Sequence, residues 1–188
     1  MAKRSVEKWN NQFLIVKKTF MDTRKLKHIL NTCSQPYILM LIGPPLSGKD
    51  TALKQMNLDA VMISRDQILM DVYGSDNYDE AFKNVNQKEV DRVLISTIQK
   101  AVKEKKNVII NMTNMTRKRR TYNLGFFSDD YYKVAVIFPI LDEAEYERRN
   151  LKRKEEEQKF IPSHVLKSMI SSYQSVTKEE GFDKIVSL

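Results

Sequence analysis

The sequence has one cysteine, Cys33, two histidines and no long apolar run. A single cysteine cannot form an internal disulfide, which excludes a secreted scaffold held together by disulfides. The lack of any Cys/His cluster excludes a structural zinc site. The longest apolar run, Tyr37–Ile42, is far shorter than the about 20 residues of a membrane span. Leu14–Val16 runs into two lysines, where a signal peptide would continue its apolar core. We therefore expect a cytoplasmic protein without a membrane partner.

The 188 residues are 41% hydrophobic and 30% charged, which is typical of one globular domain rather than of a disordered chain. The net charge is +8, and residues 1–36 supply +6 of it, from eight basic and two acidic side chains. Further basic clusters lie at residues 117–120 and 148–154. A positive surface favours polyanions, of which nucleic acid is the commonest large one. Such runs are also typical of solvated helix faces, so charge alone leaves both interpretations open.

Residues 1–35 are predicted to form a basic helical extension ahead of a main domain at residues 36–188. An apolar stripe with the spacing of one helical face comprises Trp9, Phe13, Val16 and Phe20. A second short helix is expected around Leu26–Leu30. We expect the stripe to pack on the main domain rather than to bind a partner helix. Since the same stripe could pair two subunits, the oligomeric state stays open.

From Pro36 onward, apolar runs typical of strands alternate with longer periodic segments typical of helices. This alternation predicts an α/β fold with a parallel sheet flanked by helices. In such sheets, ligands bind at the carboxyl ends of the strands. The expected strands are residues 37–42, 60–64, 107–111, 131–138 and 184–187, and the expected helices are residues 67–72, 78–105, 116–127, 142–158 and 163–173.

A glycine-rich segment, GPPLSGKDT from Gly43 to Thr51, follows the first expected strand and precedes a helical segment. This is the context that a Walker A phosphate loop requires. The glycines let backbone N–H groups converge on phosphate oxygens, and the helix directs its positive end to the same point. Lys49 would reach the outer phosphates. The predicted nucleotide-binding residues are Gly43, Ser47, Gly48, Lys49, Asp50 and Thr51.

Asp50 departs from this motif, because the residue after the lysine is usually a Ser or Thr whose hydroxyl ligates magnesium. A carboxylate oxygen is also a hard ligand and can hold Mg²⁺. Alternatively, Asp50 contacts the metal through water, or its negative charge weakens the site. We favour Asp50 as the metal ligand, because Lys49 is retained beside it.

Polar residues also end the second and third expected strands. Asp66, in the segment Ser64-Arg65-Asp66, has the position of a general base for an acceptor hydroxyl. The same segment could instead cap the helix that follows it. Residues after the third strand could cap a helix, bind phosphate or be solvated: Thr113, Asn114, Arg119 and Arg120.

A basic helical segment lies between the fourth expected strand and Pro162. Its Arg149 and Arg153 are four residues apart and therefore share one helical face. In small P-loop kinases, such a segment closes over the donor, and its arginines neutralise charge on the transferred phosphoryl group. We therefore predict a lid around residues 148–161.

Together these features resemble the bacteriophage polynucleotide 5′-kinase family, within the wider set of small P-loop kinases. The resemblance covers roughly residues 37–173. It implies transfer of the γ-phosphate of ATP, with Mg²⁺, to a 5′-hydroxyl of DNA or RNA, in a bacterial or phage-infected cell. Its marks are the phosphate loop, Ser64-Arg65-Asp66, Thr113-Asn114 with Arg119-Arg120, Arg149-Asn150 with Arg153, and Ile161-Pro162 before Leu166-Lys167-Ser168-Met169.

The resemblance also implies roles for single residues. Lys49 would hold the donor phosphates, and Asp66 would accept the proton of the 5′-hydroxyl. Arg153, with Arg149, would lie on the transferring phosphate. Residues expected to contact the substrate are Arg65, Thr113, Asn114, Arg119 and Arg120.

Two departures from the family concern the acceptor. Met112 stands where the family has an Asp, and Leu69 stands where it has an Arg that reads the phosphate on the 3′ side of the acceptor nucleotide. These changes are compatible with a kinase for the hydroxymethyl group of 5-hydroxymethyluracil within DNA. A nucleotide or small-metabolite kinase is a second alternative, which the +8 charge disfavours. A non-enzymatic nucleic-acid-binding protein is a third, which the retained Lys49, Asp66 and Arg153 disfavour.

Overall fold

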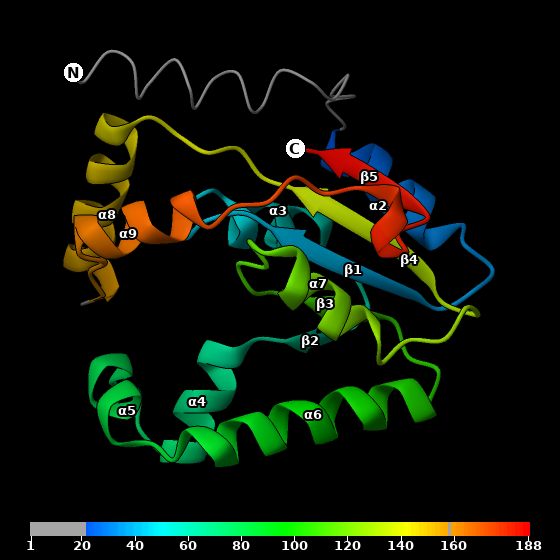
Figure 1. Cartoon of the computed structure of the whole chain (residues 1–188), viewed down its shortest axis with the longest axis horizontal. Coiled ribbons are helices and arrows are strands. Elements are labelled where there is room, and N and C mark those ends of the chain that lie inside the picture. The colour runs from blue at the N-terminus through cyan, green and yellow to red at the C-terminus, as the bar shows by residue number, and fades with distance from the viewer. Residues whose placement is uncertain (1–21, 158) are drawn as a thin grey trace.

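A computed structural model describes residues 22–157 and 159–188. Five parallel strands form one sheet, and helices cover both of its faces (Figure 1), which confirms the predicted α/β architecture. The predicted stripe from Trp9 to Phe20 lies outside the described residues. The strands are β1 Tyr37–Ile42, β2 Val61–Ile63, β3 Val108–Ile110, β4 Tyr132–Ile137 and β5 Lys184–Ser187. The helices are α2 Thr23–Asn31, α3 Lys49–Met56, α4 Arg65–Tyr73, α5 Tyr78–Asn84, α6 Gln87–Lys103, α7 Arg117–Leu124, α8 Glu143–Glu157, α9 Ser163–Ser171 and a 3-10 turn at Lys178–Glu180.

The strand order in the sheet is β2-β3-β1-β4-β5. In the central strand β1, Leu39 lies opposite Ile109 of β3 and Val134 of β4. All six residues of β1 are buried, as expected of a strand covered on both faces. The carboxyl end of β1, where the glycine-rich segment begins, therefore lies between the ends of β3 and β4.

Alternate residues of β1 supply the two layers of the core, because successive side chains of a strand point to opposite faces. Ile38, Met40 and Ile42 belong to the cluster formed with α4, α5 and α6. Leu39 and Leu41 belong to the cluster formed with α2 and α3. Each face of the sheet is thus covered by its own set of helices.

The second helix of the predicted extension is present as α2. Asp22 caps it, because its carboxylate accepts a hydrogen bond from the backbone N–H of Arg24 at 2.9 Å. Leu26 and Leu30 are almost completely buried in the α2–α3 cluster. This part of the predicted extension therefore packs on the main domain.

The segment expected to be one long helix at residues 78–105 is instead two helices, α5 and α6. Val85 has an extended backbone, and the side chain of Asn86 accepts a hydrogen bond from the N–H of Lys88 at 3.1 Å. Asn86 is therefore the N-cap of a new helix, a position at which asparagine is common. The break lets α5 turn away from α6 and pack against α4 (Figure 1).

The helices α8 and α9 lie side by side at one end of the molecule (Figure 1). Tyr146 of α8 packs with Leu166 and Ile170 of α9 in a small separate cluster. Asn150 closes the connection between them, because its side chain donates to the carbonyl of Ile161 at 2.7 Å and accepts from its N–H at 3.1 Å. No helix among the described residues is long and apolar enough to cross a membrane.

Candidate active site

The glycine-rich segment joins β1 to α3 and folds back over the carboxyl edge of the sheet. Gly48 has φ 98°, which a residue with a side chain rarely adopts. A Cβ atom on Gly43 would lie 2.8 Å from the Cβ of Phe138, so no side chain fits there. The N–H of Gly43 donates to the carbonyl of Thr113 at 3.0 Å, which fastens the loop to the end of β3. Sequence and backbone therefore agree on a phosphate-binding loop.

Lys49 is buried beneath this loop. Its Nζ donates to the carbonyls of Gly43 and Pro44, at 3.0 and 2.6 Å. Burial lowers the pKa of Lys49 to about 8, which the carboxylates of Asp50 and Asp66 partly oppose and the charge of Arg153 reinforces. Asp66 and Arg153, which are 87 residues apart in the sequence, are thus both close enough to affect the pKa of Lys49.

The loop and the first turn of α3 each carry one further predicted nucleotide-binding residue with a hydroxyl group. The hydroxyl of Ser47 is buried and has no hydrogen-bond partner among the described residues, so it can serve an incoming phosphate. Thr51 lies exposed in the first turn of α3. The loop therefore presents donors that the protein itself does not use.

Asp50, the residue in place of the usual Ser or Thr, lies exposed at the start of α3. Its carboxylate accepts a hydrogen bond from the side-chain amide of Asn111 at 2.9 Å. Sequence analysis did not assign Asn111 to the site. The available signal was a polar residue at the end of an expected strand, which capping explains equally well. The carboxylate of Asp50 and the amide oxygen of Asn111 are both ligand types that Mg²⁺ accepts.

Asp66 lies exposed in the first turn of α4. The cap of this helix is Ser64, whose hydroxyl accepts from the N–H of Gln67, so the Asp66 carboxylate is not used for capping. The hydroxyl of Tyr78 donates to this carboxylate at 3.3 Å, and burial together with Asp66 raises the pKa of Tyr78 to about 12. Asp66 follows β2, which is separated from β1 in the sheet by β3.

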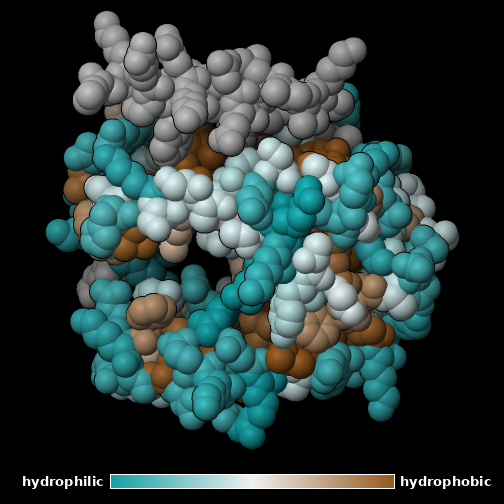
Figure 2. Space-filling view, in the orientation of Figure 1, coloured by the Kyte–Doolittle hydropathy of each residue, from teal (hydrophilic) through white to brown (hydrophobic). Residues whose placement is uncertain are grey.

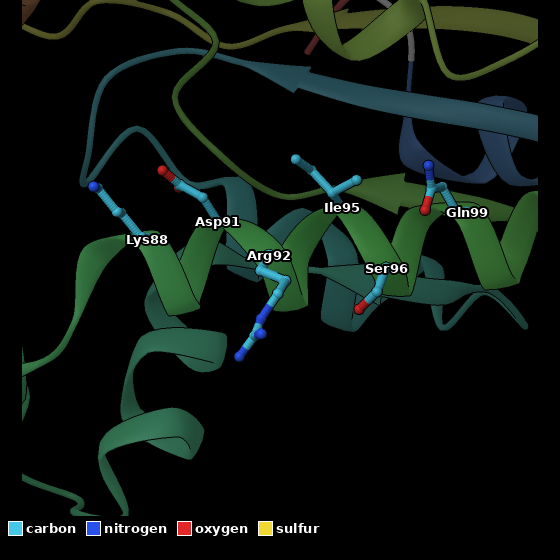
Figure 3. A pocket seen from close by; sticks show the side chains of 6 residues that line it. All are labelled: Lys88, Asp91, Arg92, Ile95, Ser96 and Gln99. Atoms are coloured by element: carbon cyan, nitrogen blue, oxygen red, sulfur yellow. The ribbon is translucent and has the colours of Figure 1, made fainter.

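Arg65 points toward α6, where its guanidinium donates to Gln87 at 2.8 Å and pairs with Asp91 at 3.0 Å. Asp91 also lines a shallow depression on the surface of α6 (Figure 3). Its side chain and that of Lys88 lie on one side of the helix, whereas Arg92 points to the other side. Gln87 and Asp91 therefore orient the Arg65 guanidinium toward α6.

Arg149 of α8 reaches the phosphate loop. Its guanidinium donates to the carbonyl of Leu46 at 2.9 Å and to Glu145 at 2.6 Å. Its Nη1 atom lies 3.9 Å from the position that a Cβ of Gly48 would take. The charge of Arg153, one turn further along α8, acts to lower the pKa values of both Lys49 and Tyr78. Both predicted lid arginines therefore lie on the side of α8 that faces the loop.

Two residues expected to contact the substrate occupy structural positions instead. Asn114 is buried with φ 47°, and its side chain bonds the carbonyl of Leu41 at 2.7 Å and the amide of Asn123 at 3.0 Å. Arg120 is fully buried and forms a double hydrogen bond with Glu180, at 2.6 and 2.8 Å. The polar atoms of both side chains already form hydrogen bonds within the protein. They therefore have none to offer a substrate, which corrects the expectation that Asn114 and Arg120 contact it.

The other two predicted contacts have different surroundings. Thr113 uses its carbonyl to hold Gly43, as described above, and its side chain is partly exposed. Arg119 is exposed on α7, and its N–H is capped by the hydroxyl of Thr116. A substrate role remains a prediction for these two residues.

Comparison with known proteins gives the following relatives. A family model described as an AAA domain matches residues 38–176. A chain of the Pnkp1/Rnl/Hen1 RNA repair complex is 23% identical, with a TM-score of 0.60 over 76% of this chain and 45% of its own length. Kti12 of Chaetomium thermophilum, in complex with ADP-AlF3, is 17% identical, with a TM-score of 0.54 over 80% of this chain and 88% of its own.

A third similar structure is from the PezAT chromosomal toxin–antitoxin system of Streptococcus pneumoniae. It is 18% identical, with a TM-score of 0.60 over 88% of this chain and 73% of its own. At these identities the solved structures establish a shared fold. The protein spans less than half the length of the RNA repair chain that it resembles.

Proposed function

The chain belongs to the AAA domain family, and from that membership and its P-loop kinase fold we propose that it transfers the γ-phosphate of ATP to a hydroxyl group of a polynucleotide. The simplest acceptor is the 5′-hydroxyl of DNA or RNA. One arrangement carries the proposal: Arg149 of the predicted lid donates to the phosphate-loop carbonyl of Leu46 at 2.9 Å, and Lys49 lies buried beneath the same loop. The charges of Asp66 and Arg153 also act on the pKa of Lys49, so a base for the acceptor and a second lid arginine lie near this cation.

On the donor side, the loop N–H groups and the Ser47 hydroxyl bind phosphate oxygens. Lys49 exchanges the carbonyls of Gly43 and Pro44 for the outer phosphates of ATP. Arg149 and Arg153 approach from α8 and stabilise negative charge on the transferring phosphoryl group. The similarity in fold to Kti12, solved with ADP-AlF3, supports a nucleotide in this position.

The residues beside the loop also fit Mg²⁺. Asp50 would hold the ion, with Asn111 fixing the carboxylate through its amide. The described residues contain no group of three His, Cys, Asp or Glu side chains able to hold a metal. Magnesium in kinases takes most of its ligands from phosphates and water, so such a group is not required. When bound, the ion neutralises charge on the phosphates of ATP.

On the acceptor side, Asp66 accepts the proton of the substrate hydroxyl as the oxygen attacks phosphorus. The hydrogen bond from Tyr78 fixes the orientation of the Asp66 carboxylate. Because Asp66 is exposed, a hydroxyl at the end of a long polymer can reach it.

Two observations support a polynucleotide as the acceptor. The net charge is +8, and exposed basic residues occupy α7 and α8, including Lys118, Arg119 and Lys152. Polyanions bind to such surfaces through their phosphates. The fold is also that of a chain from an RNA repair complex.

The test is transfer of labelled γ-phosphate to two oligonucleotides. One carries a 5′-hydroxyl, and the other has a blocked 5′ end and an internal 5-hydroxymethyluracil. We expect label on the first. Label on the second alone would identify the base-modifying alternative, and label on neither would contradict the proposal.

The variant Asp66→Asn should lower kcat by about a hundredfold or more, because an amide cannot accept the proton. Asp71→Asn is the matched control, since Asp71 lies exposed on the same helix and, among the described residues, accepts a side-chain hydrogen bond only from Gln67. Its kcat should stay near that of the wild type. Equal activity of Asp66→Asn and the wild type would remove Asp66 from the reaction.

A further inference from the structure

Two aromatic rings lie one above the other on α5. Tyr78 and Phe82 are four residues apart, and their ring centroids are 5.9 Å apart with planes inclined by 26°. Phe82 is 54% exposed, although it is a large apolar side chain on a short helix. Single exposed apolar residues are common on protein surfaces, so the exposure of Phe82 alone does not indicate a binding site. The residues around it must be considered as well.

Lys159 in the α8–α9 connection approaches the first of these rings, and Lys154 of α8 approaches a third ring, Phe160. The Nζ of Lys159 lies 5.5 Å from the centroid of the Tyr78 ring. The next residue, Phe160, is 47% exposed, and the Nζ of Lys154 lies 5.6 Å from its ring centroid. Aromatic rings and lysines therefore alternate across the space between α5 and this connection. Such alternation is typical of surfaces that bind single-stranded nucleic acid, where rings stack on bases and lysines bind phosphates.

This surface borders the candidate catalytic base. The hydroxyl of Tyr78 bonds Asp66, so the aromatic pair begins at the carboxylate and extends away from it along α5. Figure 2 shows the surface hollowed between the part of the molecule formed by α8 and α9 and the part formed by α4 and α5. A nucleotide with its hydroxyl at Asp66 would have its base beside α5.

We propose that Tyr78 and Phe82 form a stacking platform for an unpaired base of the acceptor nucleotide, with Lys154 and Lys159 on the neighbouring phosphates. This inference rests on the proposed function and specifies its substrate: a single-stranded or frayed polynucleotide end that carries a base. The base lies on the exposed face of Phe82, and Tyr78 supports that ring from behind while holding Asp66. Any of the four bases is accepted, because every base has a π face.

The test measures binding and does not depend on transfer. Single-stranded oligonucleotides carry a 5′-hydroxyl and either 2-aminopurine or an abasic residue at the first position. Wild-type protein should bind the 2-aminopurine oligonucleotide about fivefold or more tightly than the abasic one, with quenched fluorescence. Phe82→Ala and Phe82→Leu should lose this preference and the quenching, whereas Phe82→Trp should keep both.

Phe82→Leu is the critical variant, because it keeps an apolar side chain on α5 and removes only the aromatic face. Met62→Ala controls for loss of an exposed apolar side chain elsewhere, since Met62 is 45% exposed on β2. It should retain the full preference for the base. A preference that persists in Phe82→Leu, or an equal loss of affinity for both oligonucleotides, would overturn the platform.

Parallel transfer assays separate this inference from the proposed function. Base-dependent binding without transfer to either oligonucleotide would refute the function and retain the platform. Equal binding of, and equal transfer to, base-containing and abasic ends would refute the platform and retain the function.

Discussion

Lys49 carries the ionisation that most directly sets the charge of the phosphate loop. Burial lowers its pKa to about 8, so the ammonium loses its proton as the pH rises through that value. A neutral lysine cannot attract phosphate oxygens, whereas those of ATP are already ionised at this pH. ATP affinity is therefore expected to depend on pH on the alkaline side.

We expect the Kd for ATP to be nearly constant below pH 7 and to rise above pH 8, approaching about tenfold per pH unit. Equilibrium binding of a fluorescent ATP analogue from pH 6.5 to 9.5 measures this profile. Lys49→Arg should bind more weakly with a flat profile, because a guanidinium stays charged throughout that range. A flat profile for the wild type would show that Lys49 keeps its proton.

At the scale of elements, α8 is held to the phosphate loop by Arg149. Its guanidinium donates a hydrogen bond to the backbone carbonyl of Leu46 at 2.9 Å, and this bond joins α8 to the loop. Its second bond, to Glu145, fixes the guanidinium plane on the helix. Lysine has a single donor nitrogen, so it cannot place two separate nitrogens at the two acceptors as the planar fork of arginine does.

Arg149→Lys is expected to lower kcat by about a hundredfold, with a much smaller change in the KM for ATP. Arg148→Lys is the matched control, since Arg148 bonds the same Glu145 but is 64% exposed at its side chain. It should change kcat by less than about fivefold. Equal effects of the two substitutions, measured by steady-state kinetics, would assign Arg149 a role in holding α8 only.

The order of elements could be predicted from the sequence because local patterns encode it. The apolar run at Tyr37–Ile42 became β1, and β5 has the same bounds as the expected strand at residues 184–187. The break at Val85 was missed, although Asn86 is a favourable residue for a helix start, because no glycine or proline interrupts residues 78–105. The sheet order was also beyond local patterns, since β3 inserts between β1 and β2 through pairings distant in the chain.

The candidate site divides in the same way. Lys49 and Asp50 follow from a motif of adjacent residues, so the sequence identifies them. Asn111 joins the site only through Asp50, from which it is 61 residues away in the chain. Arg120 belongs to a run of four basic residues, which is typical of a solvated helix face, but its partner Glu180 is 60 residues further on. Such pairings depend on the tertiary fold.

At the scale of the whole molecule, the pair of Arg120 and Glu180 joins α7 to the segment that leads into β5. The guanidinium also donates to the carbonyls of Asn114, Met115 and Ser175, at 3.2, 3.1 and 3.1 Å. Both side chains are almost fully buried, so each charge depends on the other. Removing one partner leaves a buried charge without compensation.

Arg120→Met is expected to lower the free energy of unfolding by about 3–5 kcal/mol. Arg117→Met, which removes a 56% exposed arginine 3.9 Å from the same carboxylate, should cost less than about 1 kcal/mol. Urea unfolding followed by circular dichroism measures both. The double variant Arg120→Met/Glu180→Leu should recover part of the loss, and failure to recover any would contradict the ion-pair explanation.

The same ion pair sets an order of events during protein synthesis. Arg120 leaves the ribosome 60 residues before Glu180. At a translation rate of about 5–20 residues per second, the Glu180 carboxylate is synthesised roughly 3–12 seconds after the Arg120 guanidinium that it neutralises. Until then, water must solvate this charge, and the cavity that encloses it cannot close. The nascent domain therefore completes its interior only after the last turn before β5 has been translated.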